Sequence, residues 1–252
     1  MSDDIPVPVR RHSLSVGVLV LNYNTWDLAL RALDAAIELE AGNVAEYVLF
    51  DDGSTSLPPQ KIDNRIRLVR EKSNRGFGRA LPAAFAEMKS DIVVLFDSDA
   101  YPLTPFVTQV RERFDRDAQL GQLGFRAEDK NGSQTESYFN EPTHWSLTLG
   151  QALHAKLNKK ALQPGRLCVI TGCMATRAAA YAQVGGFDPA FEFLDVDVDY
   201  SMNLRRRGWK VEVDPAIKVF HVGGGTPQLM RHRVLHFYRS RWHLLRKYGL
   251  MP

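Results

Sequence analysis

The sequence is poor in cysteine and contains no long hydrophobic run. Its 252 residues include only two cysteines, Cys168 and Cys173, too few for the disulfide framework of a small secreted protein. No apolar stretch approaches the roughly 20 residues that a membrane-spanning helix needs. Segment 1–13, which we expect to be a flexible tail, lacks the apolar region of a signal peptide. These absences predict a cytoplasmic protein.

Several local signatures of other protein classes are missing as well. The chain has no Walker-type phosphate loop, no Cys/His cluster with the spacing of a zinc site, and no recognisable signature of a Ser-His-Asp hydrolase. We also expect no nucleic-acid partner.

Charge is distributed unevenly along the chain. The net charge is +3, yet the part from Asn203 onward has 11 lysines and arginines against 2 acidic residues, and the part before it has 21 against 27. A basic end on an acidic body predicts either an anionic partner near the C-terminus or a solvated basic helix.

Apolar runs and helical patterns alternate through the first half of the chain. The expected strands are Ser15–Leu21, Tyr47–Phe50, Ile66–Val69 and Ile92–Phe96, and the expected helices are Trp26–Glu40 and Phe77–Met88. Such alternation predicts an α/β fold with a single Rossmann-like, mostly parallel central sheet flanked by helices.

The second half is less regular. We expect a polar loop at 129–143, a strand at 167–171 and helices at 175–184 and 195–207. Two short strands around Asp214-Pro215, within 211–220, and a basic helix at 229–248 follow. No linker interrupts the pattern. We therefore expect one catalytic domain at 14–228, with the C-terminal helix at 229–252 as part of the same domain.

Polar side chains follow the expected strands. They are Asn22, Asp51, Asn74, Asp97 and Asp99. In doubly wound sheets, ligands bind at the carboxyl ends of the strands, where these residues fall. Turns favour Asn and Asp in any protein, so the alignment at one edge, rather than any single residue, predicts a site.

Asp97-Ser98-Asp99 is the most informative of these segments. Alternate residues of an extended segment point the same way, so the two carboxylates can bind one hard divalent ion, Mg²⁺ or Mn²⁺. The alternative interpretation is an Asp-rich turn.

Three aspartates alternate at Asp195, Asp197 and Asp199. An EF-hand loop starting at Asp195 would need Gly at its sixth position and Glu at its twelfth, where the chain has Tyr200 and Arg206. The remaining interpretations are a helix start, which favours carboxylates, and a general base in a cleft.

Two other segments are candidates for binding. Asn74-Arg75-Gly76-Phe77-Gly78 opens a helix and can place backbone N–H groups near a phosphate. His221 follows a strand and precedes the glycines of 223–227; it is either structural or functional.

Seven segments, in order, resemble the family-2 glycosyltransferases of the GT-A fold, and bacterial rhamnosyltransferase-like members in particular. They are VLVLNYN (18–24), LFDDGS (49–54), NRGFG (74–78), DSD (97–99), GGFD (185–188), DVDYSMNLRRRGW (197–209) and FHVGGGT (220–226). The resemblance implies an inverting, metal-dependent hexosyl or rhamnosyl transferase acting in cell-surface polysaccharide or glycan synthesis.

The resemblance also implies roles for individual residues. Asn22 and Asp51 would lie beside the base and ribose of the nucleotide, with Asp51 reading a pyrimidine N–H. The other implied residues are Asn74, Gly76 and Gly172 for the nucleotide sugar, Asp97 and Asp99 for metal and diphosphate, His221 for metal, and Asp197 as catalytic base.

Two positions depart from the family pattern. Val196 replaces the Glu that usually precedes the base, and Pro82 stands where the helix after the NRGFG segment often has an Asn. Contacts to the acceptor and to the nucleotide are therefore expected to differ at these positions.

The implied partners are a UDP-, dTDP- or GDP-sugar donor and a glycan or lipid-linked acceptor, with Mn²⁺ or Mg²⁺ as cofactor. The alternatives are a sugar-phosphate nucleotidyltransferase and a non-catalytic nucleotide-sugar-binding protein. A nucleotidyltransferase would need a Gly- and Lys/Arg-rich loop after the first strand, where this chain has Asn22-Tyr23-Asn24.

The basic segment 229–248 has an apolar stripe at helical spacing, formed by Leu235, Tyr238, Trp242 and Leu245. Such a helix can rest on an anionic membrane surface, which would place the protein at the cytoplasmic face of the membrane. Alternatively, the stripe packs on the domain, and the helix either offers its arginines to an acceptor diphosphate or only closes the fold.

Overall fold

The structure is a computed structural model. It describes residues 13–40, 42–142, 162–192, 194–221 and 230–249, with the side chains of the last range described from Tyr238 onward. The expected tail at 1–13 lies outside the described residues except for its last position, and the glycine segment at 223–227 lies entirely outside them.

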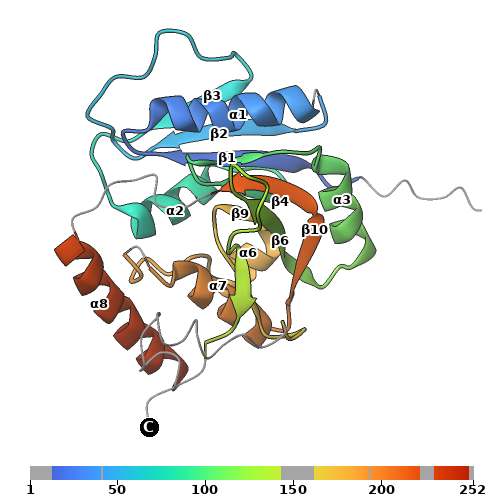
Figure 1. Cartoon of the computed structure of the whole chain (residues 1–252), viewed down its shortest axis with the longest axis vertical. Helices are drawn as coiled ribbons and strands as arrows, with labels where there is room; N and C mark the ends of the chain where they lie inside the picture. The colour runs from blue at the N-terminus through green and yellow to red at the C-terminus, as the bar shows by residue number, and fades with distance from the viewer. Residues whose placement is uncertain (1–12, 41, 143–161, 193, 222–229, 250–252) are drawn as a thin grey trace, which may run out of the picture.

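One eight-stranded sheet forms the centre of the molecule (Figure 1), with strand order β3-β2-β1-β4-β9-β6-β10-β5. β9 and β5 run opposite to the other strands. The strands are β1 (Val16–Asn22), β2 (Glu46–Asp51), β3 (Ile66–Arg70), β4 (Ile92–Phe96), β5 (Ala100–Pro102), β6 (Leu120–Glu128), β9 (Cys173–Arg177) and β10 (Lys210–His221). The predicted mostly parallel central sheet is confirmed.

Helices cover both faces of this sheet. They are α1 (Trp26–Glu40), α2 (Phe77–Ala86), α3 (Val107–Arg116), α6 (Ala178–Val184), α7 (Val196–Arg206) and α8 (Met230–Tyr248). β7 (Tyr138–Asn140) and β8 (Leu167–Val169) form a separate two-stranded sheet. No helix among the described residues is long and apolar enough to cross a bilayer.

The sheet separates two hydrophobic cores. Residues of β1 and β4 alternate between them: Val18 and Val94 pack with α1 and α3, whereas Leu19 and Leu95 pack with α2, α6 and α7. Alternate side chains of a strand point to opposite faces, so a strand covered on both sides must be apolar throughout. This explains why continuous apolar runs mark β1 and β4.

The second half contains the main errors of the sequence interpretation. Residues Ala175–Arg177, expected to be helical, belong to strand β9, and helix α6 begins only at Ala178. Ala175 and Thr176 are buried between β4 and β6, where neighbouring strands determine the backbone. The two strands expected around Asp214-Pro215 are instead one strand, β10, with an irregular register beside β6.

Helix α8 packs against α7 by a face that differs from the predicted apolar stripe. Leu244 and Tyr248 are buried, whereas Tyr238 and Trp242 are 68% and 57% exposed. The stripe residue Leu235 lies outside the described side chains, and Leu245 is partly buried. The two aromatic residues of the stripe therefore face outward.

Candidate active site

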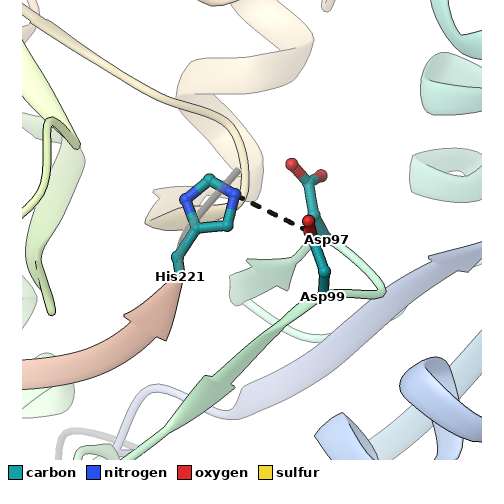
Figure 2. Close-up of side chains that lie close together, drawn as sticks. All are labelled: Asp97, Asp99 and His221. Atoms are coloured by element: carbon teal, nitrogen blue, oxygen red, sulfur yellow. Dashed lines mark ion pairs between the residues drawn. The ribbon is translucent and has the colours of Figure 1, made fainter. Parts of the chain in front are cut away.

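Asp97, Asp99 and His221 form a group of potential metal ligands. One ligand atom from each residue lies within 4.8 Å of the others, and His221 Nε2 is 3.7 Å from Asp99 Oδ1. Figure 2 shows the imidazole at the end of β10 directed at the Asp99 carboxylate, with Asp97 beside it. The structure thus brings together the three residues expected to bind metal.

Strand pairing explains why residues so far apart in sequence meet here. β5 follows directly after Asp99 and pairs antiparallel with β10, so that Ala100 lies opposite His221. Asp99 is therefore placed beside the imidazole by the register of two strands. The short strand β5 had no signal in the apolar pattern of the sequence.

Gly172 lies against the Asp97 carboxylate. Phe96 pairs with Cys173 across β4 and β9, which sets the preceding residue, Gly172, opposite Asp97. A Cβ atom at position 172 would come within 2.5 Å of Asp97 Oδ2. The absence of a side chain at Gly172 is what allows the Asp97 carboxylate to occupy this position.

Negative charge is concentrated at this end of the sheet. The pKa of Asp97 is raised to about 6: burial is the main cause, His221 opposes the shift, and the charges of Asp99 and Asp197 add to it. Carboxylate oxygens are the ligands that hard divalent cations prefer, and a cation would offset this mutual repulsion. The donor set therefore fits Mg²⁺ or Mn²⁺.

Asp197 lies in the first turn of α7. Its carboxylate accepts a hydrogen bond of 2.8 Å from the amide of Val198, and burial raises its pKa. The positive charge of Arg241 lowers that pKa, and the negative charge of Glu136 raises it. Since Asp197 also acts on the pKa of Asp97, the predicted base and the predicted metal ligands share one electrostatic environment.

The two neighbouring aspartates of α7 are engaged elsewhere. Asp195 Oδ2 is 3.0 Å from Arg241 Nε, and Asp199 Oδ1 is 2.8 Å from Lys247 Nζ. Asp197 makes no ion pair within the described part of the chain. Of the three carboxylates, Asp197 is therefore the one best placed to accept a proton.

Asn22 and Asp51 end two adjacent parallel strands and lie opposite each other in register. Asn22 donates a hydrogen bond of 2.8 Å to Asp51 Oδ1, Ser54 donates through both its amide and its hydroxyl, and Arg70 Nε lies 3.1 Å from Asp51 Oδ2. Asp51 is fully buried. A pyrimidine N–H could bind this carboxylate only by replacing one of these donors, so the role assigned to Asp51 stays a prediction.

The loop before α2 is held by Asp52, which the sequence interpretation missed. Its carboxylate accepts hydrogen bonds of 3.0 Å from the amides of Arg75 and Gly76, and Asn74 Oδ1 accepts one of 2.6 Å from Gly76. Gly76 has φ of 80°, a backbone conformation that favours glycine. The only sign of this role in the sequence was that a second aspartate, Asp52, directly follows Asp51 at the end of the strand.

Comparison with known proteins assigns the chain to a protein family. The family model described as "Glycosyl transferase family 2" matches residues 17–185, more than half of the sequence. The chain belongs to this family. It is a glycosyltransferase, and family membership removes the nucleotidyltransferase alternative.

One curated relative is the N-acetylglucosaminyl-diphospho-decaprenol L-rhamnosyltransferase of Mycobacterium tuberculosis. It is 26% identical over 217 residues, which cover 74% of this chain and 69% of that protein. The predicted resemblance to rhamnosyltransferases is confirmed.

Solved structures confirm the GT-A fold. GalNAc-T7 with UDP, GalNAc and Mn²⁺ matches with a TM-score of 0.65 and 14% identity, over 84% of this chain and 44% of that one. The mannosyltransferase PcManGT from Pyrobaculum calidifontis, in complex with GDP-Man and Mn²⁺, matches with a TM-score of 0.62 and 17% identity. The match covers 94% of this chain and 65% of that one. The chain thus spans less than two thirds of either protein.

Proposed function

We propose that this glycosyltransferase is metal-dependent and inverting, and that it moves a hexosyl or rhamnosyl group from a nucleoside-diphosphate sugar to a hydroxyl of a lipid-linked acceptor in cell-surface glycan synthesis. The observation that carries the proposal is the convergence of Asp97, Asp99 and His221 beside Asp197. The acceptor class is suggested by the Mycobacterium tuberculosis relative, which is named for a diphospho-decaprenol acceptor.

The mechanism assigns separate tasks to these side chains. Asp97, Asp99 and His221 would hold the cation, which when bound neutralises the charge of the leaving nucleoside diphosphate. Asp197 accepts the proton of the acceptor hydroxyl while the oxygen of that hydroxyl forms a bond to the anomeric carbon. The bond between the anomeric carbon and the diphosphate oxygen breaks in the same step, and the nucleoside diphosphate leaves. A single displacement of this kind inverts the anomeric configuration.

Thermal unfolding with candidate donors tests this proposal. We expect one of the UDP-, dTDP- or GDP-sugars to raise the unfolding temperature in the presence of Mn²⁺ and to lose this effect when a chelator is added. Donor at about 100 times its dissociation constant stabilises the fold by about 2.7 kcal/mol, or roughly 5–10 °C for a chain of this size. Equal stabilisation with and without the chelator would contradict metal-assisted donor binding.

The outward face of α8 supports a second part of the proposal, a peripheral contact with an anionic membrane surface. Tyr238, Trp242, Arg239 and Arg246 are all exposed on this helix, whose sequence contains no acidic residue. Aromatic residues with a polar edge favour the bilayer interface, and each basic residue near anionic lipid contributes about 1 kcal/mol. A lipid-linked acceptor would lie at the same surface.

Vesicle co-sedimentation tests the membrane contact. We expect binding to vesicles containing phosphatidylserine but not to neutral ones, and loss of that binding at high salt. The double variant Arg239→Ala/Arg246→Ala should bind about 30-fold more weakly, because the two charges together contribute about 2 kcal/mol and about 1.4 kcal/mol corresponds to a factor of ten.

The matched control is Lys61→Ala/Lys72→Ala. This pair removes the same charge from exposed positions that flank β3 in the chain, outside the exposed face of α8. Arg241 is left unchanged in both variants because it faces α7. Equal binding of both double variants, or equal binding of wild type to both vesicle types, would contradict the membrane contact.

A further inference from the structure

The inner face of α8 is joined to the beginning of α7 by ion pairs. Arg241 Nε lies 3.0 Å from Asp195 Oδ2, and Lys247 Nζ lies 2.8 Å from Asp199 Oδ1. Tyr248 donates a hydrogen bond of 2.7 Å to the same Asp199 oxygen. The two acidic residues that flank Asp197 at alternate positions are thus both held by the C-terminal helix.

The Arg241–Asp195 pair is buried, unlike an ordinary surface ion pair. Only 15% of the Arg241 side chain and 5% of the Asp195 side chain are exposed. Arg239, two residues earlier on the same helix, is 72% exposed and lies 4.0 Å from Glu192. Removing one partner of a buried pair leaves the other charge uncompensated, so this pair constrains its surroundings far more than the exposed one.

Asp195 occupies a position that sets the geometry of the first turn of α7. It is the N-cap residue and has φ of 62°, a left-handed conformation that few residues other than glycine adopt. Its carbonyl accepts the first hydrogen bond of the helix, 2.9 Å from the amide of Asp199. Fixing the Asp195 side chain therefore fixes the turn that carries Asp197.

The structure assigns Arg241 as a positioning residue for glycosyl transfer, which through its buried pair with Asp195 holds the first turn of α7 so that the Asp197 carboxylate faces the acceptor. This inference rests on the proposed role of Asp197 as the base. A small displacement of a reacting group is costly, since a misplacement of about 1 Å can lower a rate by about 10²-fold. Arg241 acts on the base from α8, the helix whose opposite face carries Trp242.

Kinetics of Arg241 variants test the inference. Turnover is measured as nucleoside diphosphate released from the donor that stabilises the protein, with Mn²⁺ and without vesicles. Arg241→Gln should lower kcat by about 10- to 100-fold with little change in the KM for the donor, because the candidate metal ligands follow β4 and end β10 rather than lying on α7 or α8. Arg241→Lys, which keeps the positive charge, should recover part of this loss.

Arg116→Gln is the matched control, since it removes an arginine from an exposed position at the end of α3, outside any proposed binding surface, and it should turn over like wild type. Asp195→Asn tests the pair from the other side and should show the same loss of kcat, including if Arg241→Gln fails to fold. Wild-type kcat in Asp195→Asn and Arg241→Gln would overturn the inference. So would an equal loss in Arg241→Lys and Arg241→Gln accompanied by loss of donor-induced stabilisation, because that pattern indicates a general packing role.

Asp197→Asn, assayed in parallel, separates this inference from the proposed function. If Asp197→Asn is inactive while Arg241→Gln and Asp195→Asn are fully active, the base stands and the positioning role is wrong. If Asp197→Asn is fully active, the proposed base is wrong, and any loss in the Arg241 variants has another cause.

Discussion

Asp197→Asn is expected to lower turnover by about 10²–10⁴-fold, the usual effect of losing a positioned acid–base group. The amide cannot accept the proton of the acceptor hydroxyl, although it fills nearly the same volume. Donor binding should change little, because Asp197 lies on α7 whereas the candidate metal ligands follow β4 and end β10. Steady-state kinetics and donor-induced thermal stabilisation measure the two quantities separately.

Asp27→Asn is the matched control for this variant. Asp27 is the second residue of α1 as Asp197 is the second residue of α7, and it is exposed. The control therefore removes the same interaction with a helix dipole without removing a base, and it should retain full turnover. Weak donor binding by Asp197→Asn combined with normal turnover of the bound donor would assign Asp197 a structural role instead.

The N-terminal half of the fold could be predicted from sequence because its central strands are covered on both faces. Residues 16–21 and 92–96 must be apolar throughout, and a continuous apolar run is visible in the sequence. β9 gave no such signal: Cys173–Arg177 contains Thr176 and Arg177 and has no long apolar run, and its strand conformation is determined by β4 and β6 on either side. Local patterns cannot encode a strand whose conformation comes from its neighbours.

The candidate site shows the same division. Asp97 and Asp99 were found because they are close in sequence, and His221 was found because it follows a strand and precedes glycines, with its metal role taken from the resemblance. No arginine of the basic segment was singled out, because helical periodicity pointed to Tyr238 and Trp242 instead. The buried charge pair with Asp195 was not anticipated, since apolar periodicity carries no information about which arginine meets a carboxylate.

The two faces of α8 suggest why this end of the chain is basic. Its inner face places Arg241 and Lys247 against aspartates of α7, while its outer face exposes Arg239 and Arg246. The basic residues of α8 therefore lie on two separate faces. A packing helix and the proposed membrane-facing helix, which compete at the level of sequence, are compatible because they concern opposite sides of one element.

Asp99→Asn is expected to abolish the metal dependence of the enzyme and to lower transfer by about 10²-fold or more. A metal ion contributes several kcal/mol to stabilising the charge that develops on the leaving group, and each 1.36 kcal/mol corresponds to a factor of ten. The fold should persist, because Asp99 lies in a turn and its side chain remains 21% exposed. The unfolding temperature without ligand should match that of wild type, while the increase produced by donor and Mn²⁺ is lost.

Asp117→Asn provides the matched control at the opposite end of β10. Asp117 pairs with Lys210, the first residue of the strand, whereas Asp99 pairs with His221, the last. The same exchange of carboxylate for amide, made beside the same strand, should leave both transfer and Mn²⁺-dependent donor binding intact. If Asp99→Asn instead retained wild-type transfer in the presence of a chelator, the Asp97–Asp99–His221 group would have no role in metal binding. The burial of Asp97 and its repulsion by Asp99 and Asp197, which together raise its pKa, would then have to be relieved in another way.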